Sequence, residues 1–299
     1  MRRKRLFGLV MGTIAALLWG ISGPASEMLF DHQVDVAWLI SSKMLIAGVI
    51  TMVLAWRLQG KTALLAPWRE RRASGQLLIF ILFGMLAMQY IYFKAVAVAN
   101  APTATILQFL SPVLVLIYVA LQARQLPRRT DVLIIALAMF GTLLVVTKGQ
   151  LTALAITPQA LAWGLMAALA AAAYAILPAQ LLKRHSPLVV TAWAQLLGGI
   201  AMTVVRPFWV DCPHLTIGQW GAYAFVVIGG TIVAYLLYLI SLQYVSVTAV
   251  SLLDAFEPLG ATVTAVVFFG FHLGFFELIG GTLIIITVLL MSITEPKAP

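Results

Sequence analysis

The sequence predicts an all-α integral membrane protein whose ten transmembrane helices form two inverted five-helix repeats. Three observations support this fold class. First, 62% of the 299 residues are apolar and 10% are charged, compared with about 45–50% and about 25% in soluble domains. Second, apolar segments of about 20 residues, the length that crosses a bilayer, recur along the whole chain. Third, the two halves of the sequence resemble each other.

Composition also excludes several classes of protein. A water-soluble globule of this composition would expose large apolar patches. The single cysteine, Cys212, cannot form an internal disulfide and matches no metal-ligand spacing. The net charge of +9 would indicate nucleic acid only as a basic patch on a soluble surface. The expected partner is therefore the lipid bilayer and not nucleic acid.

Ten apolar segments make up most of the chain. They cover residues 6–29, 36–56, 76–98, 102–123, 132–147, 158–182, 187–206, 219–243, 247–270 and 275–293. No segment shows the alternating pattern of barrel strands, so helices are expected. The basic Met1–Arg5 followed by an apolar run also resembles a signal peptide. We expect a retained first helix, because the run exceeds the roughly 7–15 residues of such a signal.

Basic residues are distributed unevenly between the two sides of these segments. Ten spans place 15 of the 19 Lys and Arg residues on one side and three on the other, with Lys43 inside a helix. The positive-inside rule then predicts that both termini of this multi-pass protein are cytoplasmic. The compact sequence, without long loops or a transit segment, favours a bacterial inner membrane. The residues on the richer side are Arg2, Arg3, Lys4, Arg5, Arg57, Lys61, Arg69, Arg71, Arg72, Arg124, Arg128, Arg129, Lys183, Arg184 and Lys297.

An internal duplication divides the chain at residue 150. Ala101–Pro112 aligns without gaps with Val247–Pro258 at an offset of 146, and the same offset carries Tyr92 onto Tyr238. We expect one five-helix repeat in residues 1–150 and a second in residues 151–299. Because five is odd, the second repeat enters the membrane from the opposite side. Secondary transporters use such inverted repeats for alternating access.

In its later motifs the chain resembles the EamA-type ten-helix branch of the drug/metabolite transporter superfamily. The resemblance rests on Leu252–Pro258 and on the Gly-Gly-Thr-Leu-Ile run at 280–284. The family's usual Gly-Glu pair is replaced by Gly270-Phe271, and by Ala123-Arg124 in the first half. The resemblance implies export or exchange of small polar or amphipathic metabolites, with no ATP site and no bound cofactor. It leaves a homodimer open.

Polar side chains inside the expected ninth and fourth helices form matching stripes. Ionisable residues at membrane depth are costly and indicate function by default. The two stripes are expected to face a shared central cavity that holds the substrate. They consist of Ser251, Asp254 and Glu257 in the ninth helix, and of Thr105, Gln108 and Ser111 in the fourth.

Several of these residues have competing interpretations. Glu257 precedes Pro258, so its carboxyl could instead satisfy the backbone at a kink. Lys43 is the one deeply placed cation and could pair with Asp254, Glu257 or Glu27, or extend to the external interface. The mid-helix aromatic residues could stack on a flat ligand or simply pack between helices. These residues are Trp19, Tyr90, Tyr92, Tyr174, Trp193, Tyr235 and Tyr238. The site candidates among them are Trp19, Tyr90, Tyr174 and Tyr238.

These features favour a secondary active transporter, an exporter or exchanger of small metabolites such as amino acids or amphiphilic amines and drugs. Asp254 or Glu257 would be the natural coupling group if protons drive transport. One alternative is a passive channel or facilitator. Another is an integral-membrane enzyme, which would need clustered Asp or His residues, whereas the histidines are scattered at His32, His185, His214 and His272.

Overall fold

The computed structural model describes residues 2–150, 157–261, 264 and 274–294. All regular secondary structure in these ranges is helical, and eight helices are long and apolar enough to cross a membrane. The all-α membrane class is therefore confirmed. The count of ten remains a prediction, because part of the expected span 247–270 lies outside the described ranges. Gly270, Phe271, His272 and Lys297 also lie outside them.

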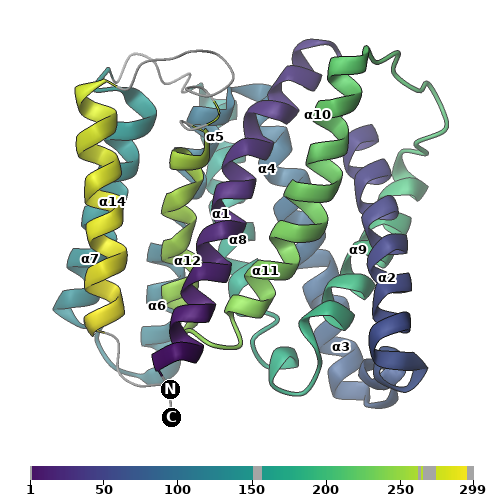
Figure 1. Ribbon diagram of the computed structural model, residues 1–299, viewed down its shortest axis with the longest axis horizontal. Coiled ribbons are helices and arrows are strands. Elements are labelled where there is room, and N and C mark those ends of the chain that lie inside the picture. Colours follow the sequence, from purple (N-terminus) through teal and green to yellow (C-terminus); the bar gives the residue numbers. More distant parts are fainter. Residues whose placement is uncertain (1, 151–156, 262–263, 265–273, 295–299) are drawn as a thin grey trace.

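The first half of the chain forms five helical stretches, drawn from purple to teal in Figure 1. They are α1 (Arg2–Asp31), α2 (Val36–Arg69), the continuous run of α3 (Arg71–Ile79), η1 (Phe80–Leu86) and α4 (Ala87–Val98), the pair α5 (Ala101–Gln108) and α6 (Ser111–Ala123), and α7 (Arg129–Thr147).

The second half repeats this order. Its elements are α8 (Pro158–Ile176) with the short η3 (Leu181–Lys183), α9 (Pro187–Val205), the continuous run of α10 (Ile217–Val227), η4 (Ile228–Val233) and α11 (Ala234–Ser241), the pair α12 (Val247–Leu253) and η5 (Asp254–Phe256), and α14 (Phe275–Thr294).

Several expected spans differ from the helices observed. The helix expected over 102–123 breaks at Phe109–Leu110, and the one expected over 158–182 leaves α-helical geometry after Ile176. The helix expected over 36–56 continues to Gly60, whose φ of 78° turns the chain into a second short helix over residues 61–69. The helix expected over 76–98 begins at Arg71 and contains the π-helical segment η1.

The irregular points recur in both halves at the sequence offset of 146. Asn100 caps α5 by accepting from Thr103 N at 2.8 Å, and its mate Ser246 caps α12 by accepting from Ala249 N at 3.1 Å. The break after Gln108 matches the change of helix type at Asp254. Gly84 and Gly230 lie in the two π-helical segments. The duplication therefore extends to backbone defects, which are common at functional sites.

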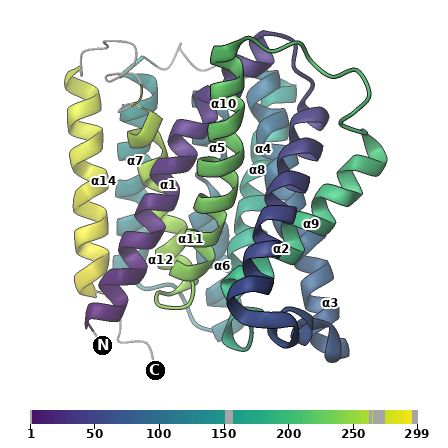
Figure 2. The same cartoon turned by 45° about the vertical axis from the view of Figure 1, so that its right-hand side comes forward.

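Equivalent helices of the two halves pack against each other in antiparallel pairs. Gly48 of α2 lies against the backbone of Leu196, and Gly199 of α9 lies against that of Leu45. The residue numbers of the two contacts run in opposite directions, so α2 and α9 are antiparallel (Figure 2). Gly141 of α7 and Gly280 of α14 make a similar close contact. Antiparallel equivalent helices are what an inverted repeat requires.

Ion pairs lie at both ends of the bundle. We call the end where α1 begins and α14 ends the lower end (Figure 1). There Arg184 Nη1 lies 3.2 Å from Glu70 Oε2. At the upper end Arg206 lies 3.6 Å from Asp35 and 3.5 Å from Asp211. The start of α1 and the end of α14 lie at the same end of the bundle (Figure 1), as an even number of spans requires.

Candidate functional site

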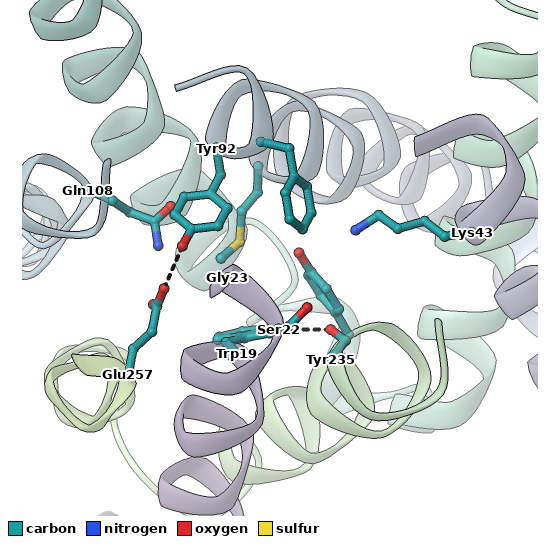
Figure 3. Close-up of a pocket in the computed structure, with 11 residues that line it drawn as sticks. Trp19, Ser22, Gly23, Lys43, Tyr92, Gln108, Tyr235 and Glu257 are labelled. Atoms are coloured by element: carbon teal, nitrogen blue, oxygen red, sulfur yellow. Dashed lines mark hydrogen bonds between the residues drawn. The ribbon is translucent and has the colours of Figure 1, made fainter. Parts of the chain in front are cut away.

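A small central cavity lies where the two halves meet. Its volume is about 20 Å³, which is room for about one water molecule. Side chains from α1, α2, α4 and α5 of the first half face η4, α11 and Glu257 of the second half (Figure 3). The lining residues are Trp19, Ser22, Gly23, Lys43, Met88, Tyr92, Phe93, Gln108, Gly230, Tyr235 and Glu257.

Glu257 is held in this cavity by hydroxyl groups of the first half. Its Oε1 accepts hydrogen bonds from Tyr92 Oη at 3.0 Å and from Thr105 Oγ1 at 3.3 Å. Gly20 of α1 lies directly against the Glu257 backbone, and a side chain there would collide with it. The predicted stripes therefore meet, since Thr105 of the first binds Glu257 of the second. These two hydroxyl groups hold the Glu257 carboxyl without an ion pair to Lys43.

Lys43 enters the cavity from the side opposite Glu257 (Figure 3). Its side chain is 1% exposed, and Nζ lies 4.0 Å from the centre of the Phe93 ring. No carboxylate in the described part of the chain lies within 4.0 Å of Nζ. Lys43 thus neither extends to the interface nor pairs with Asp254, Glu257 or Glu27. Partly buried Glu27 instead accepts from Ala101 N at 3.4 Å.

The desolvation cost of a charged Lys43 is only partly offset inside the cavity. A desolvated cation–π contact contributes about 2 kcal/mol, whereas the effective cost of burying one ion is several kcal/mol. The ring of Phe93 therefore offsets only part of that cost. A ligand that brings a negative group to Nζ would supply the rest.

Two buried side-chain oxygen atoms, one from a residue of the cavity wall and one from its repeat mate outside the wall, have no hydrogen-bond partner in the described residues. They are Oε1 of Gln108 and Oδ1 of Asp254, and the two residues are repeat mates. Buried acceptors without donors are rare and costly. This side of the cavity therefore lacks donors, or a positive charge, that a ligand or a proton could provide.

An aromatic cluster forms the wall of the cavity and the layer behind it. Trp19 Nε1 donates to the carbonyl oxygen of Gly230 at 3.1 Å, where the π-helical η4 frees a backbone acceptor. The Trp19 ring contacts Tyr235 at 4.9 Å and Tyr238 at 5.1 Å between ring centres. Tyr174 lies 5.2 Å from Tyr238. Trp19 and Tyr235 line the cavity, whereas Tyr174 and Tyr238 support them.

The other predicted candidates lie away from the cavity wall. Ser251 Oγ donates to its own helix, to the carbonyl of Thr248 at 2.9 Å. Ser111 is buried at the start of α6. Tyr90 packs against Trp163 with ring centres 6.4 Å apart. Among the described residues, no group of three or more His, Cys, Asp or Glu side chains could hold a metal ion.

Sequence reasoning did not select several residues that the structure places in the wall. They are Ser22, Gly23, Met88, Phe93 and Gly230, whereas Tyr92 and Tyr235 were named only as mid-helix aromatic residues and not as site candidates. Tyr92 had a usable signal, since its repeat mate Tyr238 was among the candidates. Phe93 and Met88 had none, because apolar residues in an apolar helix carry no positional information.

Comparisons with known proteins agree on one family. The sequence profile described as "EamA-like transporter family" matches residues 6–147 and again residues 159–293. A relative in Salmonella typhimurium, "Uncharacterized inner membrane transporter YicL", is 30% identical over 294 residues, covering 97% of this chain and 96% of the relative.

More distant relatives and a solved structure extend the comparison. "Uncharacterized transporter YyaM" of Bacillus subtilis is 24% identical and covers 74% of each chain. An "Uncharacterized transporter" of Archaeoglobus fulgidus is 27% identical, covering 67% of this chain and 70% of the relative. A crystal structure with 18% identity superposes with a TM-score of 0.75, covering 95% of this chain and 96% of that one. This likeness shows a shared fold.

The geometry at Glu257 predicts unequal effects of two tyrosine substitutions in α4. Tyr92→Phe removes a donor to a buried carboxyl, and we expect a loss of about 1–3 kcal/mol of stability. Tyr90→Phe removes a hydroxyl that has no hydrogen bond to any described residue, so it should cost little. Thermal unfolding of the purified proteins in detergent measures the difference. Equal stability of the two variants would contradict the Tyr92–Glu257 interaction.

Proposed function

The chain belongs to the EamA-like transporter family and is a membrane transporter, not an enzyme; we propose that it is a secondary active transporter of small metabolites. In this proposal amino acids or amphiphilic amines cross a bacterial inner membrane by alternating access at the central cavity. The observation that carries it is the position of Glu257, a carboxyl of one repeat bonded by Tyr92 and Thr105 of the other.

The charges around the cavity favour a substrate with both an ammonium and a carboxylate group. Asp254 Oδ1 and Gln108 Oε1 lack donors, and Glu257 adds a carboxyl to the cavity wall, so an ammonium group would find acceptors here. Lys43 on the opposite side needs an anion. The rings of Trp19, Phe93 and Tyr235 offer apolar faces for the remainder of the ligand. A cationic amine without a carboxylate would bind the acceptor oxygens but would leave Lys43 without an anion.

Alternating access accounts for the small volume of the cavity. A site that holds about one water molecule must widen before it accepts a metabolite. The helix breaks at Phe109–Leu110 and Asp254–Phe256 lie next to the polar stripes, one in each half. Transporters of inverted-repeat design bind substrate at such breaks and rock one part of the bundle against the other. A passive channel would instead need a continuous open path.

We also propose that the lower end of the bundle faces the cytoplasm, because the basic residues gather there. Cys212, the chain's single cysteine, is exposed in the upper loop between α9 and α10. A membrane-impermeant maleimide added to intact cells should therefore label the native protein. Arg184→Cys in a Cys212→Ser background should be labelled only after the cells are opened. The reverse pattern would refute this orientation.

The proposed site of proton coupling is one of two buried carboxyls, Glu257 of the cavity wall or Asp254, which lies three residues before it and outside the wall. Substrates would first be sought by counterflow of radiolabelled amino acids in proteoliposomes. With a substrate so found, Asp254→Asn should abolish uptake driven by a pH gradient, since the amide cannot carry a proton, while exchange at equal pH should partly persist. Asp211→Asn, at an exposed position of the upper loop, is the matched control.

The same measurement separates the alternatives. Gradient-driven uptake that is unchanged in Asp254→Asn would reject Asp254 as the coupling residue. Uptake of a solute without saturation and without counterflow would favour the passive facilitator instead, because only a carrier with an alternating site exchanges solute for solute.

A further inference from the structure

A second, larger pocket lies at the lower end of the bundle, away from the central cavity. Its volume is about 220 Å³. It lies between the start of α3 and the turn that joins α8, η3 and α9, two segments that are distant in sequence. The lining residues are Glu70, Arg72, Ala73, Gln76, Gln180, Leu181, Arg184 and His185. None of them lines the central cavity.

The pocket contains more hydrogen-bond donors than its own residues use. Arg72 has no ion pair or hydrogen bond to any described residue, and the side-chain amides of Gln76 and Gln180 likewise have none. His185 Nε2 is buried without a partner in the described part of the chain. Burial lowers the pKa of the His185 imidazole, so the ring is neutral near pH 7. Its free nitrogen still needs a partner.

One carboxylate faces these donors, and its interaction is weak. Glu70 Oε2 lies 3.2 Å from Arg184 Nη1, with both side chains more than half exposed, at 56% and 72%. Exposed pairs of this kind contribute about 0–1 kcal/mol. The five N–H donors of a guanidinium allow Arg184 to bind a second anion while it keeps Glu70. The two arginines and one glutamate of the pocket therefore give it a net positive charge.

The position of the pocket fits the membrane–water boundary. The short helix over residues 61–69 leads directly into it and follows the turn at Gly60. Within that helix Trp68 contacts Trp193 at 5.2 Å, and Trp193 Nε1 donates to the carbonyl of Leu64 at 2.8 Å. Tryptophan is enriched at the depth of lipid headgroups. Basic residues at this depth attract acidic lipids.

We propose that this pocket binds a phosphate group, that of an acidic phospholipid headgroup or free inorganic phosphate, through Arg72, Arg184 and the Gln76 and Gln180 amides. Arginine forks match the oxygens of a phosphate in geometry and charge. A phosphate bound there would join α3 to the α8–α9 turn, which belong to opposite halves of the transporter. The site does not depend on which substrate the central cavity takes.

Native mass spectrometry of the purified full chain tests the proposal. The protein is titrated with phosphatidylglycerol and with phosphatidylcholine, and binding of labelled inorganic phosphate is measured by equilibrium dialysis. Arg72→Gln/Arg184→Gln should weaken phosphatidylglycerol binding roughly thirtyfold, at about 1 kcal/mol for each basic residue. Arg128→Gln/Arg129→Gln, which removes two exposed charges at the same end outside the pocket, should change it little.

The two sources of phosphate give different results. Loss of phosphatidylglycerol binding in the pocket variant, with phosphatidylcholine weak throughout, identifies a lipid site. Loss of inorganic phosphate binding alone identifies a soluble anion. Glu70→Gln provides a gain-of-binding variant, since it frees Arg184 and should tighten binding severalfold. The proposal is overturned if wild type binds neither ligand, or if the pocket variant and the Arg128/Arg129 control bind equally.

Discussion

The arrangement of this transporter depends on the cost of charged groups inside a bundle that faces lipid. A charge at membrane depth must find polar partners within the protein, because neither lipid nor distant water provides them. Glu257 finds two, Tyr92 and Thr105, and both come from the opposite repeat. The same contacts that satisfy Glu257 therefore hold the halves together at the centre. Any movement that separates the halves at this point must break or replace these bonds.

Lys43 and two buried oxygen atoms are polar groups that the protein compensates only in part or not at all. The ring of Phe93 compensates Lys43 only in part, and Gln108 and Asp254 each retain a buried acceptor without a donor. Such groups lower stability unless a ligand completes them. Stability is commonly lower at sites shaped for binding. Because a cationic side chain and a carboxyl lie on opposite sides of one small cavity, the site favours a ligand that carries both charges.

Duplication explains why the irregular backbone lies where it does. The capped starts of α5 and α12, the breaks that follow them and the two π-helical segments occupy equivalent positions in the two repeats. Each π-helical segment contacts the first helix of the other half, η4 through Trp19 and η1 through the backbone of Tyr174 beside Gly84. A wider helical turn frees a carbonyl, and in η4 Trp19 uses it. The defects thus connect the repeats across the cavity.

Much of the fold, and less of the site, could be predicted from the sequence. Span length, basic residues and the offset of 146 report hydrophobic burial and duplication, so the helical membrane class and the polar stripes followed directly. The π-helical segments could not be predicted, because Phe80–Leu86 is as apolar as any regular helix. Of the two partners of Glu257, Thr105 lay in a predicted stripe, whereas Tyr92, 165 residues away in sequence, was not expected to bind it. Lys43 was expected either to pair with a carboxylate or to extend to the external interface, yet it packs on Phe93. Residue spacing does not encode the three-dimensional distance between charges.

Ligand-induced thermal shifts test the central claim most directly. The purified protein and its Glu257→Gln variant would be heated with amino acids, with the corresponding amines that lack the carboxylate, and with the corresponding acids that lack the amine. If Glu257 and Lys43 bind the two ends of a substrate, at least one amino acid stabilises the wild type more than either analogue does, and Glu257→Gln loses that shift. An acid that stabilises both proteins equally, or an amino acid whose shift survives Glu257→Gln, would contradict it.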